Sequence, residues 1–144
     1  MSGARETIHA TTVAISRGGG WRGVLLAGRS GAGKSDLALR LIDRGARLVA
    51  DDYTDLHEED GVLIATPPGR IAGRIEVRGI GIVEMACLPA VPVALLVALD
   101  EPVERMPEAR VRHLAGIAVP LVALAALEGS APIKVELALA GIAG

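Results

Sequence analysis

Short apolar runs alternate with glycine-rich breaks along the chain, and one of these breaks separates a strand-like run from a helical one. Residues 23–27 are apolar and strand-like, whereas residues 36–44 carry leucine and isoleucine at helical spacing. Gly45 follows that helix as a candidate C-cap. The pattern therefore predicts a strand, a loop over residues 28–35 and a helix, in that order.

Most of the other apolar runs are short and rich in β-branched residues, which is typical of strands. We expect strands over residues 7–16, 21–27, 46–50, 62–65 and 91–99, with hairpin turns at residues 17–20 and 58–61. Residues 119–124 fit an edge strand because Pro120 interrupts the run, and residues 133–140 fit a strand or a helix. A chain of 144 residues with this mixture predicts a single α/β domain spanning residues 1–144.

The composition restricts the partners and the compartment. Hydrophobic residues make up 51% of the chain and phenylalanine is absent, so the core must be aliphatic. A formal net charge of −2 gives no broad basic field, and we do not expect nucleic acid as a partner. No uncharged apolar run approaches the ~18 residues of a membrane span, and the first residues lack the apolar core of a signal peptide. With Cys87 as the only cysteine, these features predict a soluble cytoplasmic protein with no membrane partner.

The break after residue 27 carries a sequence pattern that binds phosphate. It reads Gly28-Arg29-Ser30-Gly31-Ala32-Gly33-Lys34-Ser35 and fits G-x-x-x-x-G-K-[ST] between a strand and a helix. The glycines let successive N–H groups point inward as an anion nest, and the start of the helix adds a positive field. In such a loop Lys34 would contact the β- and γ-phosphates, and the Ser35 hydroxyl would ligate Mg²⁺. The alternative is a glycine-rich turn before an ordinary helix.

Three aspartates are candidates for the metal ligand or for the base that takes the proton of the reacting hydroxyl. Asp51 and Asp52 follow the strand over residues 46–50, and their alternative role is a solvated turn. Because adjacent side chains point to opposite faces of an extended chain, we expect at most one of these carboxylates to face the phosphates. Asp100 follows the buried strand over residues 91–99 and is their strongest rival as the metal carboxylate.

Two further segments carry charged side chains that could reach a nucleotide. Glu76 and Arg78 alternate with apolar residues, so we expect both on one face of an extended segment. They could serve as a metal ligand and a phosphate clamp, or form a surface ion pair. Arg105 lies just past the strand over residues 91–99, where it could enter the site or remain a solvated loop residue.

Four segments together are similar to one family. They are residues 28–35, the run Arg47-Leu48-Val49-Ala50-Asp51-Asp52, the run Ile75-Glu76-Val77-Arg78-Gly79-Ile80-Gly81-Ile82, and Thr7-Ile8-His9. In this combination the chain resembles the C-terminal catalytic domain of the HPr kinase/phosphorylase family, in a short form without the family's N-terminal domain. The resemblance implies an α/β fold with a mixed β-sheet around a phosphate loop, akin to phosphoenolpyruvate carboxykinase.

The resemblance also implies an activity, namely ATP-dependent phosphorylation of a serine on HPr, the small phosphocarrier of the sugar phosphotransferase system. Matched position by position, Lys34 is the catalytic lysine on the ATP phosphates. Ser35 and Glu76 match Mg²⁺ ligands, and Asp51, which belongs to the same motif as the base, joins this metal set.

On the acceptor side, the resemblance makes Asp52 the general base that takes the serine proton, with His9 nearby and Arg105 as an active-site arginine. It also implies a hexamer. The family's proline- and arginine-bearing loop for phosphorolysis has only residues 131–134 as its counterpart, so the reverse reaction is not carried over. Two other functions fit the same loop: a different P-loop kinase or nucleotide hydrolase, and a non-catalytic nucleotide-sensing module.

Overall fold

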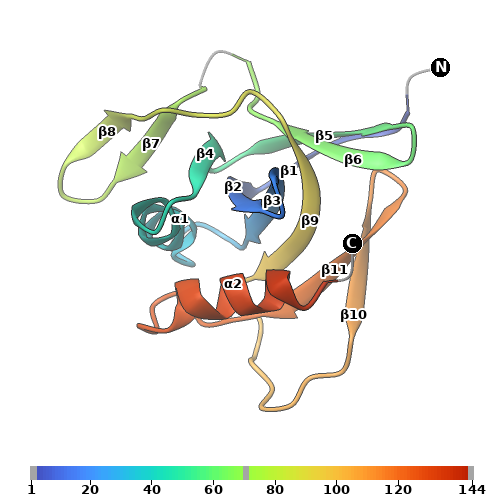
Figure 1. The fold of residues 1–144 in the computed structure, drawn as a ribbon. Helices are drawn as coiled ribbons and strands as arrows, with labels where there is room; N and C mark the ends of the chain where they lie inside the picture. Colours follow the sequence, from blue (N-terminus) through green and yellow to red (C-terminus); the bar gives the residue numbers. More distant parts are fainter. Residues whose placement is uncertain (1–2, 70–71, 143–144) are drawn as a thin grey trace.

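A computed structural model describes residues 3–69 and 72–142 of the chain. Within these residues two helices, α1 (Lys34–Asp43) and α2 (Ala131–Ala140), lie on the same side of a curled, mixed β-sheet (Figure 1). The predicted α/β fold is confirmed. So is the strand–loop–helix order around residues 28–35, which we call the phosphate loop.

In this part of the chain nine strands form the main sheet, and two more form a separate hairpin. The main-sheet strands are β1 (Arg5–Ile8), β2 (Ala10–Arg17), β3 (Gly20–Ala27), β4 (Arg47–Ala50), β5 (Thr54–Glu59), β6 (Val62–Thr66), β9 (Val91–Ala98), β10 (Arg110–Leu114) and β11 (Ile117–Ala123). Their order is β1-β5-β6-β9-β3-β2-β4, and β11 branches from β9 and carries β10. The separate hairpin consists of β7 (Arg74–Val77) and β8 (Gly81–Glu84).

Strand β9 is the branch point of the sheet and runs parallel to β3 and β11. Its start also pairs with β6, so two strands share one edge of β9. The expected edge strand over residues 119–124 is therefore wrong, because β11 pairs with both β9 and β10. Pro120, which has no N–H, precedes the residues that pair with β9. Since β3 and β9 are parallel, Ala27 and Ala98 lie side by side, just before the phosphate loop and Asp100.

A bend at His9 divides the predicted strand over residues 7–16. Before the bend β1 pairs with β5, whereas after it β2 forms the predicted hairpin with β3 and also pairs with β4. The expectation of one continuous strand is wrong because the chain changes its pairing partners at this residue. His9 consequently lies between two strands that belong to different parts of the sheet.

The sheet buries apolar residues on both faces. On β3, Val24 and Leu26 pack in one cluster with Leu37 and Leu41 of α1 and with residues of α2. The alternate β3 side chains face a second cluster, which the curled sheet provides through β5, β6, β10 and β11. The large core side chains are aliphatic, as predicted. Helix α1 ends one residue before the position predicted, because Arg44 is its C-cap and Gly45, predicted as the C-cap, follows with a φ of 111°.

Candidate active site

The phosphate loop connects the end of β3 to Lys34, the first residue of α1. Gly33 at the helix N-cap has a φ of 93°, and a Cβ added there would lie 2.8 Å from the Cβ of Ala126. The Lys34 side chain is only 5% exposed, and its Nζ donates a 3.1 Å hydrogen bond to the Arg29 carbonyl. The ammonium group therefore lies across the loop, where it would meet an anion held by the backbone N–H groups.

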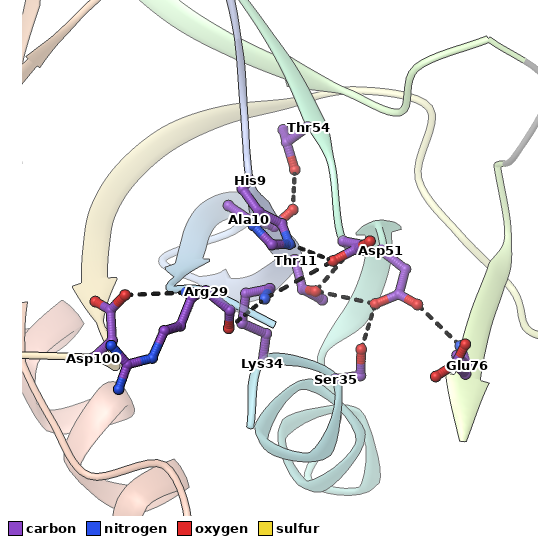
Figure 2. Close-up of polar contacts among 11 residues, drawn as sticks. His9, Ala10, Thr11, Arg29, Lys34, Ser35, Asp51, Thr54, Glu76 and Asp100 are labelled. Atoms are coloured by element: carbon purple, nitrogen blue, oxygen red, sulfur yellow. Dashed lines mark hydrogen bonds and ion pairs between the residues drawn. The ribbon is translucent and has the colours of Figure 1, made fainter. Parts of the chain in front are cut away.

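The Asp100 side chain stabilises the phosphate loop by a hydrogen bond to the loop's backbone. Its Oδ2 accepts a 3.0 Å hydrogen bond from the N–H of Arg29. Ser35 instead donates its hydroxyl to Oδ1 of Asp51 at 2.6 Å (Figure 2). Of the two candidate metal carboxylates, Asp51 is therefore the one in contact with Ser35.

The Asp51 carboxylate accepts three hydrogen bonds, two of them from the predicted metal-ligand residues Ser35 and Glu76. Its Oδ1 accepts from the hydroxyls of Ser35 and of Thr11 (3.0 Å), and its Oδ2 accepts from the N–H of Glu76 at 2.9 Å. Oxygen ligands of this kind suit Mg²⁺, which takes one or two protein carboxylates and completes its shell with water and phosphate oxygens. The described residues hold no preformed cluster of three carboxylate, histidine or cysteine groups.

Asp52 lies between His9 and Lys34. Its Oδ1 is 2.7 Å from His9 Nε2 and 3.8 Å from Lys34 Nζ. The φ of Asp52 is 67°, so the chain is not extended here, and both Asp51 and Asp52 contact phosphate-loop residues. The expectation that at most one of them faces the phosphates assumed an extended chain, which the structure does not have at this point. The Asp52 and His9 side chains are 53% and 32% exposed, which leaves the pair accessible to an incoming hydroxyl.

Two residues that the sequence did not single out hold this pair in place. Thr11 is fully buried, accepts the N–H of Asp52 at 3.0 Å and donates its hydroxyl to Asp51. Tyr53 stacks on His9, with ring centroids 4.9 Å apart and planes inclined by 16°. In the sequence, Thr11 is visible only as a hydroxyl residue in a predicted strand, and Tyr53 only as the chain's one tyrosine, next to Asp52. The sequence does not show which side chains these two residues contact.

A cleft of about 300 Å³ opens beside the phosphate loop, at the carboxyl ends of β3 and β9. Its lining includes His9, Gly28, Arg29, Asp100 and Arg112. Arg112 lies on β10, and the sequence did not mark it as a site residue. Crevices at the carboxyl ends of parallel strands are frequent ligand sites in α/β proteins. This cleft gives access to His9 and to the phosphate loop from one side.

Two of the predicted arginines lie in exposed segments outside the strands. Strand β7 ends at Val77, so Arg78 begins the exposed turn to β8, and the expectation that it shares a strand face with Glu76 is wrong. Arg105 lies in the exposed segment between β9 and β10. No hydrogen bond or ion pair within residues 3–69 and 72–142 joins either arginine to the loop. Their roles stay predictions.

Comparison with known sequences identifies the family. The profile of the family described as HPr Serine kinase C-terminal domain matches residues 3–89, which include the phosphate loop, Asp51, Asp52 and Glu76. The chain belongs to this family. No helix in the described part of the chain has the length and apolar character needed to cross a membrane.

Named relatives and a solved structure resemble the domain. The HPr kinase/phosphorylase of Clostridium kluyveri is 54% identical over 66 residues, which are 46% of this chain and 21% of that protein. The HPr kinase/phosphorylase of Geobacillus sp. is 51% identical over 67 residues, which are 46% of this chain and 22% of that protein. The matches therefore span about a fifth of the length of these relatives. The structure of the Hpr(Ser) kinase/phosphatase from Coxiella burnetii has a TM-score of 0.77 and 32% identity, covering 92% of this chain and 87% of that chain.

Proposed function

We propose that this protein transfers the γ-phosphoryl group of ATP to a serine hydroxyl of the phosphocarrier protein HPr. The names of its relatives and of its structural neighbour support HPr as the acceptor. The observation that carries the proposal is the position of the Asp52 carboxylate, 2.7 Å from His9 and 3.8 Å from Lys34. A carboxylate beside the lysine of a phosphate loop is suitably placed to take a proton next to a γ-phosphate.

The nucleotide side of the reaction uses the loop and the residues around Asp51. The N–H groups of residues 28–35 and the Lys34 ammonium group bind the phosphates and neutralise their charge. Ser35, Asp51 and Glu76 would hold Mg²⁺, which when bound supplies electrostatic stabilisation of the phosphoryl group in flight. Because Ser35 donates its proton to Asp51, the lone pairs of its oxygen remain available to a cation.

On the acceptor side, Asp52 acts as the general base. It takes the proton of the serine hydroxyl as the serine oxygen bonds to the γ-phosphorus and the bond to the bridging oxygen of ADP breaks. His9 hydrogen-bonds the Asp52 carboxylate and orients it, and the stacked Tyr53 ring restricts the imidazole. Since Asp52 is 53% exposed, its proton can then pass to solvent while ADP leaves.

The test combines purified protein, Mg·ATP and the HPr of its own host. The proposal predicts one added phosphate on one HPr serine, located by mass spectrometry, and no product with an HPr variant in which that serine is alanine. Transfer only to small acceptors, such as free serine or glycerol, would identify a metabolite kinase. ATP binding without transfer or hydrolysis would identify a nucleotide-sensing module.

A further inference from the structure

The cleft beside the phosphate loop contains an arginine that the proposed ATP site does not use. Arg112 extends from β10 and lines this cleft together with His9 and Arg29. Figure 2 shows Arg29 on one side of Lys34 and the proposed metal ligands on the other. The cleft therefore lies on the side of the lysine away from these ligands. His9, which hydrogen-bonds Asp52, also lines the cleft, so an acceptor that enters the cleft comes close to the proposed base.

Arg112 has only a weak partner within the protein. Oε1 of Glu101 accepts a 2.8 Å hydrogen bond from Nη1 of Arg110, and this bond raises the pKa of Arg110. The other Glu101 oxygen is 3.8 Å from Nη2 of Arg112, beyond hydrogen-bond distance. The Arg112 side chain is 45% exposed. Its fork of N–H donors is therefore available to another anion.

The acidic residue of the cleft does not cancel the positive charge around it. Asp100 accepts the backbone N–H of Arg29 at 3.0 Å and keeps its single negative charge, against two arginines in the lining. Within the described residues, the Arg29 guanidinium makes no hydrogen bond or ion pair. The lining thus holds two arginines, one aspartate and His9, so positive charge exceeds negative charge in it. Such a lining attracts an anion small enough for a cleft of about 300 Å³.

We propose that this cleft binds the phosphate group of the phosphoserine product, and that Arg112 is the residue that distinguishes the phosphorylated from the unphosphorylated acceptor. The inference rests on the proposed function, because a phosphoserine arises here only if the serine reaches Asp52 through the cleft. The planar fork of an arginine matches two oxygens of a phosphate monoester, which a neutral hydroxyl cannot replace. Arg112 therefore stabilises the product complex and slows product release.

The test measures binding of a phosphoserine peptide, and of the same peptide without phosphate, to the protein saturated with Mg·ADP, by titration calorimetry. Arg112→Gln is expected to weaken phosphopeptide binding about tenfold or more, the loss typical of a charge-assisted hydrogen bond. The unphosphorylated peptide should change by less than about twofold. Arg110→Gln is the matched control, since it removes an arginine from the same strand and the same glutamate but outside the cleft.

Two results would overturn the assignment. The first is an Arg112→Gln variant that keeps both its thermal midpoint and the wild-type affinity for the phosphopeptide. The second is an Arg110→Gln variant that loses as much phosphopeptide affinity as Arg112→Gln does, because the effect would then come from the overall positive charge and not from Arg112. The calorimetry requires no turnover and is therefore separate from the kinase assay. A protein that bound the phosphopeptide through Arg112 but did not phosphorylate HPr would disprove the proposed function and the role of the cleft as a product site, while phosphate recognition by Arg112 would stand.

Discussion

Replacing Asp52 by asparagine tests the proposed base with little change in shape. The substitution removes the proton acceptor, while the amide oxygen can still accept a hydrogen bond from His9. General-base catalysis contributes about 10²- to 10⁴-fold to a rate. Transfer to HPr should therefore fall by about that factor, which corresponds to about 3–5 kcal/mol of transition-state stabilisation.

The same substitution should leave ATP binding nearly intact. Oδ1 of Asp52 and Nζ of Lys34 are 3.8 Å apart, and the Asp52 side chain is 53% exposed. Because water reaches the Asp52 carboxylate and screens the pair, their attraction is about 1 kcal/mol. Without the Asp52 carboxylate, the Lys34 ammonium group interacts with the phosphates only. ATP affinity should therefore stay equal or rise by up to about fivefold.

The assay compares single-turnover HPr phosphorylation with ATP binding in the same preparations. Asp60→Asn is the matched control, since Asp60 is an exposed carboxylate in the β5–β6 turn with a φ of 49°, which asparagine accepts. A variant Asp52→Asn that transfers phosphate at the wild-type rate would refute the base assignment. Loss of ATP binding together with transfer would show that Asp52 belongs to the nucleotide site instead.

Three other substitutions probe the metal, the buried polar link and the loop. Glu76→Gln should raise the Mg²⁺ concentration for half-maximal transfer about tenfold without changing the thermal midpoint, and an unchanged Mg²⁺ titration would remove Glu76 from the metal ligands. Thr11→Val leaves the N–H of Asp52 without its buried acceptor, and should lower the free energy of unfolding by about 1–3 kcal/mol; an unaltered urea midpoint would contradict this. Gly33→Ala places a Cβ 2.8 Å from that of Ala126 at a φ of 93°, so ATP affinity and thermal midpoint should both fall. Wild-type nucleotide binding in this variant would show that the loop tolerates the strain.

Local patterns predicted much of the fold and the nucleotide side of the site. The motif over residues 28–35 lies, as predicted, between a strand and a helix, because its glycines and its flanks act within one short stretch. The Ser35 hydroxyl and the backbone N–H of Glu76 both contact Asp51, although the three residues lie on different segments, and their roles as metal ligands stay predictions. The aliphatic pattern also predicted a sheet with buried strands.

The acceptor side depends on tertiary structure that no local pattern carries. The bend at His9 arises because the chain changes from pairing with β5 to pairing with β3 and β4, which alternation of side chains cannot reveal. Adjacent side chains point to opposite faces only in an extended chain. Asp52 has a left-handed φ, so this rule does not apply to Asp51 and Asp52. Arg112 reaches the cleft because β10 joins the sheet through the branch at β9, whereas Arg105 has a more favourable position in the sequence but lies in an exposed loop.

The central claim is that the phosphates of ATP bind between the metal ligands around Asp51 and the Asp52–His9 pair. A crystal structure with Mg²⁺ and a non-hydrolysable ATP analogue tests this most directly. The account predicts a γ-phosphate against Nζ of Lys34, a magnesium ion on the Ser35 side, and an Asp52 carboxylate that faces the open cleft. A nucleotide bound away from residues 28–35, or a cleft filled by the nucleotide with Asp52 serving as a metal ligand, would contradict it.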